Sequence, residues 1–525
     1  MRAEGRPAAA TALLLAALAA TLPAAASVPR APAAPRVAAA SADDARLLAQ
    51  AADRADAGDC AGVLALLDPL VAGAAPVASG TRFSAQLLRM PCLAATGRGK
   101  EVAPVLAELQ ARAPHHPLVR AFEIFIAADQ GRFDAAADGL AAIADEGSPA
   151  LQLMPSSLWR ALAQRLTVAG DIARRDRTAL ALARAGWTPE DRPELAESLA
   201  LQGIGTLLDS GETAQARALL ARVQRPAALW DMAIQRRYAP LWPAIEARLG
   251  AASGVAADRF ARTALAAFAA APNEDRARLD AVRAFIALGR GADAERTAAP
   301  VAAVPGLGED RLDMALDDAT AKSARGAGQA AIDRVLPFAR LDLARTPEAT
   351  AAIIVLGELY EEAGDHAAAL ALARTTLARN GPFSAFGTAW LRRTEVCALA
   401  GLGEQAQAAR AADAMRATAG DNQPAAVEAA LCANQDDAAE RLAIAALATR
   451  DGASRLAEQF QPQGAFFLHP PGRMRARWAA LLARPAVRAA FDRVARILPE
   501  RLWPAATPRA LPAPPPPPAD GLTST

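Results

Sequence analysis

Glycine recurs along most of this chain at intervals near 39 residues, each time between two stretches rich in alanine and leucine. Between successive members from Gly58 to Gly211 the steps are 39, 34, 39 and 41 residues. The series continues through Gly250 to Gly403 in steps of 36 to 39 residues, and Asn434 takes the last place. A fixed period in this range indicates a helical solenoid, whose neighbouring repeats share one continuous core.

We expect each recurring glycine to form the tight turn inside an antiparallel helix pair. Glycine adopts the left-handed backbone conformation of such a turn without a steric penalty from a Cβ atom. An acid directly after the glycine, as in Gly364-Asp365, caps the second helix of the pair. Gly328 fits the period between Gly289 and Gly364, so we assign it to the turn of that repeat.

The composition agrees with an all-α chain and limits the kinds of partner. Alanine, leucine and arginine favour helix, and no long stretch alternates β-branched and aromatic residues as a strand does. The 57 Lys and Arg residues balance the 56 Asp and Glu residues, which leaves a formal charge of +1. This balance gives no electrostatic reason to expect a nucleic-acid partner.

One repeat carries a recognisable motif. Residues 356–370 read Leu-Gly-Glu-Leu-Tyr-Glu-Glu-Ala-Gly-Asp-His-Ala-Ala-Ala-Leu and resemble the tetratricopeptide repeat, with further similar stretches at 122–140, 207–220 and 394–412. The resemblance implies a right-handed superhelical solenoid of about eleven antiparallel helix pairs with a C-terminal capping helix. It also implies that a protein or peptide binds the concave face, which the first helix of each pair lines.

We predict five parts along the chain. They are a signal peptide at 1–26, a Pro/Ala-rich linker at 27–41, the repeat array at 42–450, closing helices at 451–503 and a Pro-rich disordered tail at 504–525. The signal peptide combines basic Arg2 and Arg6, an apolar run to Leu22 and small residues before Ser27. No later apolar run is long enough to span a membrane, so we expect an exported, periplasmic or secreted bacterial protein. An uncleaved N-terminal anchor is the alternative.

The four cysteines fit an oxidising compartment. Cys60 and Cys92 lie 32 residues apart, and Cys397 and Cys432 lie 35 apart. Each separation is close to one repeat, which returns the chain to a neighbouring position, so we predict the disulfides Cys60–Cys92 and Cys397–Cys432. Four reduced and buried cysteines are the alternative.

Catalytic, cofactor and metal motifs are not found in the sequence. His115-His116 lies in a proline-flanked loop without further ligands, and His366 follows the turn of one repeat. Glu197-Ser198 could belong to a peptidoglycan-cleaving enzyme, but no lysozyme-like domain follows it. We therefore predict no enzyme, no cofactor and no metal. A cell-wall enzyme or accessory, or a membrane-tethered sensory module, is the alternative function.

The best-formed repeat supplies the candidate binding residues. By the repeat register we place six side chains on or near the binding face: Glu358, Glu361, Glu362, Trp390, Arg392 and Arg393. The glutamates favour a basic peptide and the arginines an acidic one, while Trp390 offers an aromatic anchor. A solvated helix face with no partner is the alternative. The aromatic stretch from Trp230 to Trp242 is expected to pack two helices around Pro240, or else to be a partner patch.

Overall fold

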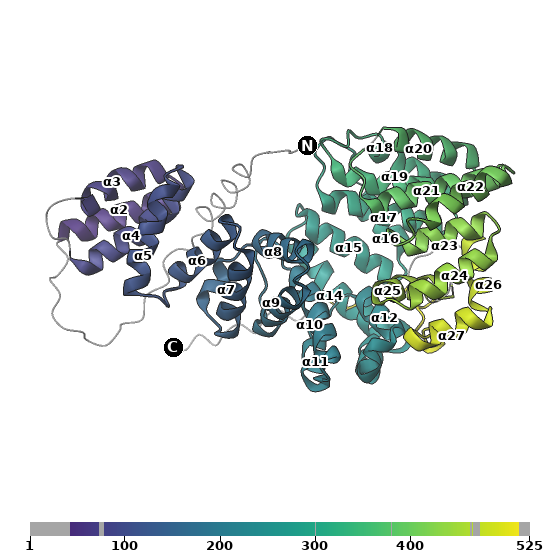
Figure 1. Cartoon of the computed structure of the whole chain (residues 1–525), viewed down its shortest axis with the longest axis horizontal. Helices are drawn as coiled ribbons and strands as arrows, with labels where there is room; N and C mark the ends of the chain where they lie inside the picture. Colours follow the sequence, from purple (N-terminus) through teal and green to yellow (C-terminus); the bar gives the residue numbers. More distant parts are fainter. Residues whose placement is uncertain are drawn as a thin grey trace. The chain divides into compact units, whose positions relative to one another are not determined.

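The computed structural model describes residues 42–72, 78–299, 301–379, 381–462, 465 and 473–513. The chain divides into two compact units, Met1–Arg222 (unit 1) and Val223–Thr525 (unit 2). The expected signal peptide at 1–26, the linker at 27–41 and the end of the Pro-rich tail lie outside the described residues. Each unit is all-α in its described part, as predicted (Figure 1).

Unit 1 is a succession of helix pairs. Its elements are α2 (Ala42–Asp56), α3 (Cys60–Ala72), α4 (Ser79–Ala95), α5 (Gly99–Arg112), α6 (Pro117–Asp129), α7 (Phe133–Asp145), η1 (Pro149–Leu153), α8 (Ser156–Val168), α9 (Ile172–Ala185), α10 (Leu195–Asp209) and α11 (Thr213–Leu220). Helices pack mainly on their nearest neighbours in sequence, as in α2 with α3 and α4. Such packing is what a repeat array requires, because no single pair can bury its own apolar face.

Unit 2 begins irregularly and then continues as pairs. Its elements are α12 (Pro226–Ile234), η2 (Arg236–Leu241), α13 (Trp242–Leu249), η3 (Ala251–Ser253), α14 (Gly254–Ala270), α15 (Asp275–Ala287), α16 (Gly291–Ala298), α17 (Glu309–Ala324), α18 (Gly328–Ala339), η4 (Pro347–Ala349), α19 (Thr350–Glu362), α20 (His366–Ala378), α21 (Ala385–Gly401), α22 (Gln405–Arg416), α23 (Gln423–Cys432), α24 (Asp436–Leu447), α25 (Arg450–Gln459), α26 (Arg473–Leu482), α27 (Pro485–Val494) and η6 (Glu500–Leu502). The first helices of successive pairs, α19, α21, α23 and α25, pack side by side.

The turns follow the predicted pattern with one correction. Glycines with positive φ stand at all the expected turns but one: Gly58, Gly97, Gly131, Gly170, Gly211, Gly250, Gly289, Gly364 and Gly403. Between α17 and α18 the turn residue is Gly326 (φ 81°), whereas the predicted Gly328 begins α18. The period alone could not separate two glycines two residues apart. Asn434, the member without glycine, also has positive φ (56°), which its short polar side chain tolerates.

Two disulfides join neighbouring repeats in the predicted pairing. Cys60 at the start of α3 is bonded to Cys92 in α4, and Cys397 in α21 is bonded to Cys432 at the end of α23. In each case one repeat separates the two cysteines, so the bond ties one helix pair to the next. The second disulfide therefore links two first helices of the array, α21 and α23.

The end of unit 2 returns to its beginning. The indole nitrogen Nε1 of Trp230 in α12 donates to the carbonyl of Ala465, 2.6 Å away. Past α27, the backbone nitrogen of Arg496 donates to the carbonyl of Ile234 at 2.8 Å, and its guanidinium lies 3.6 Å from the centre of the Trp242 ring. The chain's own C-terminal segment therefore covers aromatic residues that the sequence left as either helix packing or a partner patch.

This return continues into the segment that we predicted as the start of a disordered tail. In residues 504–513, the Arg509 guanidinium pairs with Asp258 of α14 at 2.6 Å. The backbone nitrogen of Arg509 donates to the carbonyl of Leu288 at 2.9 Å. The segment is thus held by α14 and the end of α15. Within the part of the chain that the structure describes, no helix is long and apolar enough to cross a membrane.

Candidate functional site

A pocket of about 610 Å³ lies in unit 2 on the face of the first helices. Helices α19, α21, α23 and α25 contribute to its lining, and α26 adds side chains from the closing segment. We call it the glutamate pocket after the four carboxylates that line it together with two indoles: Glu358, Glu361, Glu362, Glu428, Trp390 and Trp478.

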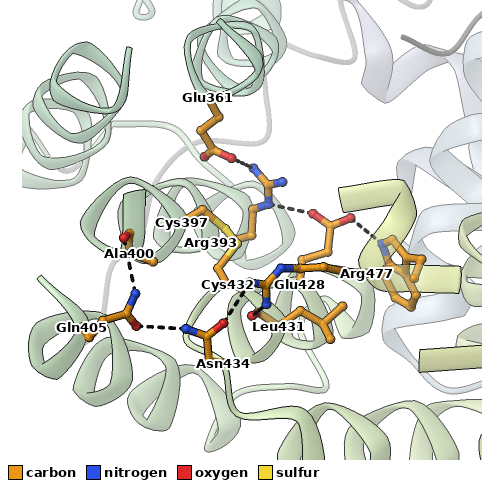
Figure 2. Close-up of a disulfide and its surroundings, with 11 residues drawn as sticks. Glu361, Arg393, Cys397, Ala400, Gln405, Glu428, Leu431, Cys432, Asn434 and Arg477 are labelled. Atoms are coloured by element: carbon orange, nitrogen blue, oxygen red, sulfur yellow. Dashed lines mark hydrogen bonds and ion pairs between the residues drawn. A yellow bond between two sulfur atoms is a disulfide. The ribbon is translucent and has the colours of Figure 1, made fainter. Parts of the chain in front are cut away.

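A buried arginine connects three of the helices (Figure 2). Arg393 of α21 is only 6% exposed. Its Nη1 lies 2.5 Å from Glu361 Oε2 on α19, and its Nε lies 2.7 Å from Glu428 Oε2 on α23. The other oxygen of Glu428 accepts a hydrogen bond from Trp478 Nε1 of α26 at 3.0 Å. One charged network therefore holds the first helices of three repeats and the closing helix together.

The network contains more negative than positive charge. Burial raises the pKa of Glu361 to about 8 and that of Glu358 to about 7, against the opposing attraction of Arg393. Burial by itself would lower the pKa of Arg393, but the Glu361, Glu428 and Glu358 carboxylates outweigh it and raise that pKa. Burial, aided by repulsion from neighbouring carboxylates, therefore outweighs the attraction of Arg393, and Glu358 and Glu361 hold their protons more tightly than exposed glutamates do.

Two polar atoms at this site have no hydrogen-bond partner among the described residues. They are Oε1 of Glu361 and Nδ1 of His366, both shielded from solvent. Glu358 is half-buried beside Arg393, and its carboxylate has no hydrogen bond or ion pair with the described residues. Since buried polar groups in folded proteins are nearly always paired, Glu361 Oε1 and His366 Nδ1 mark a place where a polar partner is missing.

Hydrogen bonds to uncharged acceptors surround the disulfide on the other side of the pocket (Figure 2). Arg477 of α26 donates from Nη2 to Asn434 Oδ1 at 2.8 Å and from Nη1 to the carbonyl of Leu431. Asn434 in turn donates to Gln405 Oε1 at 3.4 Å. Cys397 and Cys432 also line the pocket, so the bond between α21 and α23 fixes the spacing of this wall.

The structure brings five of the six predicted binding residues together. The sixth, Arg392, is exposed and lines a separate pocket of about 610 Å³ with Glu395 and Thr388. Successive residues on a helix point about 100° apart, so Arg392 and its neighbour Arg393 face different sides of α21. Arg393 itself pairs with two glutamates, which argues against it as a docking group for an acidic ligand.

Sequence reasoning missed several residues of this pocket. Glu428 follows Arg393 by 35 residues, which is also the spacing of the second disulfide, so the repeat register could have identified it. Arg475, Arg477 and Trp478 lie on α26, whose return over the first helices is not part of the repeat. No local pattern in the sequence signals that return.

The other residues considered from the sequence lie elsewhere. Glu197 is a buried residue of α10 in unit 1, and His116 precedes α6 at the loop between repeats. Burial lowers the pKa of His116. Among the described residues, no group of three or more His, Cys, Asp or Glu side chains is arranged to hold a metal ion.

Comparison with known proteins adds little to this picture. No family model matches the chain, and no curated protein matches it in sequence. Among solved structures, the tetratricopeptide-repeat domain of P58(IPK) matches with 15% identity over 86% of this chain and 97% of that chain, with a TM-score of 0.19. A TM-score of this size carries no structural inference, and the helix-pair architecture stands on the packing within this chain.

Proposed function

We propose that the protein is a non-catalytic, tetratricopeptide-like scaffold of the cell envelope that binds a protein or peptide in the glutamate pocket. The observation that carries this proposal is the pocket itself, which side chains from four successive first helices and the closing helix line. Faces of this kind are where helical solenoids generally hold their partners. The aromatic ring of Trp390 beside charged groups is typical of a binding hot spot.

Two observations support a location outside the cytoplasm. Residues 1–26 read as a signal peptide, and the four cysteines form two disulfides. Mass spectrometry of the protein from its native host should find a mature N-terminus at Ser27 and no free thiols. A chain that begins before Ser27 in the membrane fraction would contradict export in soluble form and favour the tethered alternative.

Selection from a random peptide library tests the binding function. The full chain is immobilised, enriched peptides are synthesised, and their affinities are measured by fluorescence anisotropy. Ala400 lines the pocket, so Ala400→Trp should fill it and weaken binding about tenfold or more. Ala406→Trp on the exposed face of α22 is the matched control and should bind as the wild type does. Failure to enrich any peptide, or equal binding by Ala400→Trp, would overturn the proposal.

A further inference from the structure

Some carboxylate oxygens of the glutamate pocket accept hydrogen bonds and others do not. Glu361 gives one oxygen to Arg393 and Glu428 gives one to Arg393 and one to Trp478. Oε1 of Glu361 is left without a hydrogen bond, and Glu358, one helical turn before it, makes neither a hydrogen bond nor an ion pair with the described residues. Acceptors are therefore left over on α19, at one end of the pocket.

The arginines of the pocket, in contrast, already have acceptors. Arg393 donates to two glutamates, Arg477 to Asn434 and the carbonyl of Leu431, and Arg475 to the carbonyl of Gln459 at 3.0 Å. A ligand that brings more negative charge would meet carboxylates that already repel one another. A ligand that brings positive charge and N–H donors would supply what the pocket lacks.

We propose that the glutamate pocket takes a cationic side chain of a peptide partner, a lysine ammonium or arginine guanidinium, between Glu358 and Glu361. The inference rests on the proposed function and assigns the chemistry of its ligand. The aliphatic stem of such a side chain would lie near the ring of Trp390, where cations are also favoured. Arg393 already lies 5.9 Å from the centre of that ring. A pocket of about 610 Å³ is large enough for one long side chain and part of the adjoining backbone.

Binding of a cation should depend on pH in a defined direction. The charged and titratable groups that face the site are these: on α19 Glu358, Glu361 and Glu362, on α20 His366, on α21 Arg393, on α23 Glu428 and on α26 Arg475 and Arg477. Glu358 and Glu361 have pKa values raised to about 7 and 8, so they are partly protonated near neutral pH. A cation favours their ionised forms, so its affinity rises between about pH 6 and pH 9 and its binding releases protons near pH 7.5.

Titration calorimetry with small probes tests the inference on the full chain. The probes are Nα-acetyl-lysine amide, its uncharged counterpart Nα-acetyl-norleucine amide and the anionic Nα-acetyl-glutamate amide. We expect the lysine probe to bind best, with proton release detected from the difference between two buffers of unlike ionisation heat. Glu358→Gln should weaken its binding about tenfold or more, because one charge-assisted contact is lost.

Glu358→Gln keeps the shape of the side chain and removes a half-buried carboxylate that has no ion pair among the described residues, so the variant is expected to fold. Glu395→Gln on α21 is the matched control, because Glu395 pairs with Arg374 and lines the other pocket. Equal binding of the lysine and norleucine probes, tighter binding of the glutamate probe, or no effect of Glu358→Gln would overturn the inference.

The two proposals fail in different ways. Library peptides that bind the wild type, are blocked by Ala400→Trp and carry no essential Lys or Arg would overturn the cationic ligand and leave the peptide-binding function standing. If no library peptide binds, the proposed function fails. If the lysine probe also shows no binding, the cationic site fails with it.

Discussion

Two clusters of carboxylates, one in each unit, are held in opposite ways. In unit 1, burial of Asp68 is outweighed by hydrogen bonds from Arg98 and Arg89, which lower its pKa. Arg82 does the same for Glu108. In the glutamate pocket of unit 2, burial wins, and the pKa values of Glu358 and Glu361 are raised.

The same helix-pair architecture thus holds charged side chains in two ways. Where at least one arginine faces each carboxylate, the charges bridge repeats and the interface is complete. Where one arginine serves several carboxylates, as Arg393 does, the network holds the helices together and still has acceptors to offer. The proposed binding site therefore rests on the shielded, unpartnered oxygen of Glu361 rather than on the mere presence of charged residues on a helix face.

The largest expected effect comes from removing the aromatic side chain that closes the pocket. Trp478 is 1% exposed, donates to Glu428 and packs edge-on against Phe460. Trp478→Ala should lower the free energy of unfolding of unit 2 by about 3–5 kcal/mol. Trp187→Ala in unit 1, where the side chain is 2% exposed, should cost a similar amount in its own unit but leave peptide binding unchanged.

Urea denaturation followed by hydrogen exchange and mass spectrometry can assign each loss to its unit. Weakened protection confined to peptides of residues 223–513 is expected for Trp478→Ala. The comparison between the units would break down if Trp187→Ala abolished peptide binding as completely as Trp478→Ala does.

Removal of an arginine from each cluster should give the next largest difference in unfolding free energy between the two units. Arg393→Met leaves Glu358, Glu361 and Glu428 buried without their cation, which we expect to cost about 3–5 kcal/mol in unfolding free energy. Arg89→Met in unit 1 should cost only about 1–2 kcal/mol, because Asp68 keeps Arg98 at 2.5 Å. Lower pH should restore part of the stability of Arg393→Met by protonating the glutamates. Equal costs for the two variants, or no recovery at pH 5, would count against the distinction.

The disulfides should have similar effects on stability and different effects on binding. Replacing either pair by alanine should cost about 2–4 kcal/mol, since the closed loops of 32 and 35 residues are nearly equal. Only loss of Cys397–Cys432 should weaken peptide binding, because these cysteines line the pocket. Anisotropy with a selected peptide measures this difference. Equal loss of binding in both variants would show that the effect is one of global stability.

The smallest expected effect is the change of the unfolding free energy with pH, which has opposite signs for the two clusters of carboxylates. Glu358 and Glu361 have folded-state pKa values above those of the unfolded chain. Their stabilisation of the folded state is therefore complete below about pH 4.5 and is lost as the pH rises through 7 to 8. The lowered pKa values of Asp68 and Glu108 have the opposite effect. These two groups stabilise the folded state above about pH 4, and this stabilisation is lost on acidification.

Between pH 5 and pH 8, unit 2 should therefore lose at most about 1.4 kcal/mol per pH unit for each of the two glutamates. Unit 1 should instead gain slightly as the pH rises to about 6.5, because burial lowers the pKa of His116. Urea midpoints read separately for each unit check this expectation. The double variant Glu358→Gln, Glu361→Gln should flatten the slope of unit 2. An unchanged slope in that variant would assign the pH dependence to other groups.

Much of the fold follows from local features of the sequence, because repeats bring the same positions together each time. The turn glycines, the two disulfides and the facing of Glu361 and Arg393 all depend on spacings close to one repeat. The misassigned turn at Gly328 shows the resolution of such reasoning, which is a few residues. What the spacing cannot show is a contact outside the repeat, such as Arg496 with Ala233, 263 positions away in the chain. The contribution of α26 to the pocket belongs to this second kind.

The return of the C-terminal segment also bears on how the two units can change over generations. In an open array each repeat contacts only its neighbours, so duplication or deletion of a pair is tolerated wherever the junction matches. Unit 1 has that freedom. Unit 2 does not, because Arg496 must reach Trp242 and Arg509 must reach Asp258 after a set number of pairs. Gain or loss of one pair would separate these contacts, so unit 2 is expected to keep its repeat number while unit 1 varies in length.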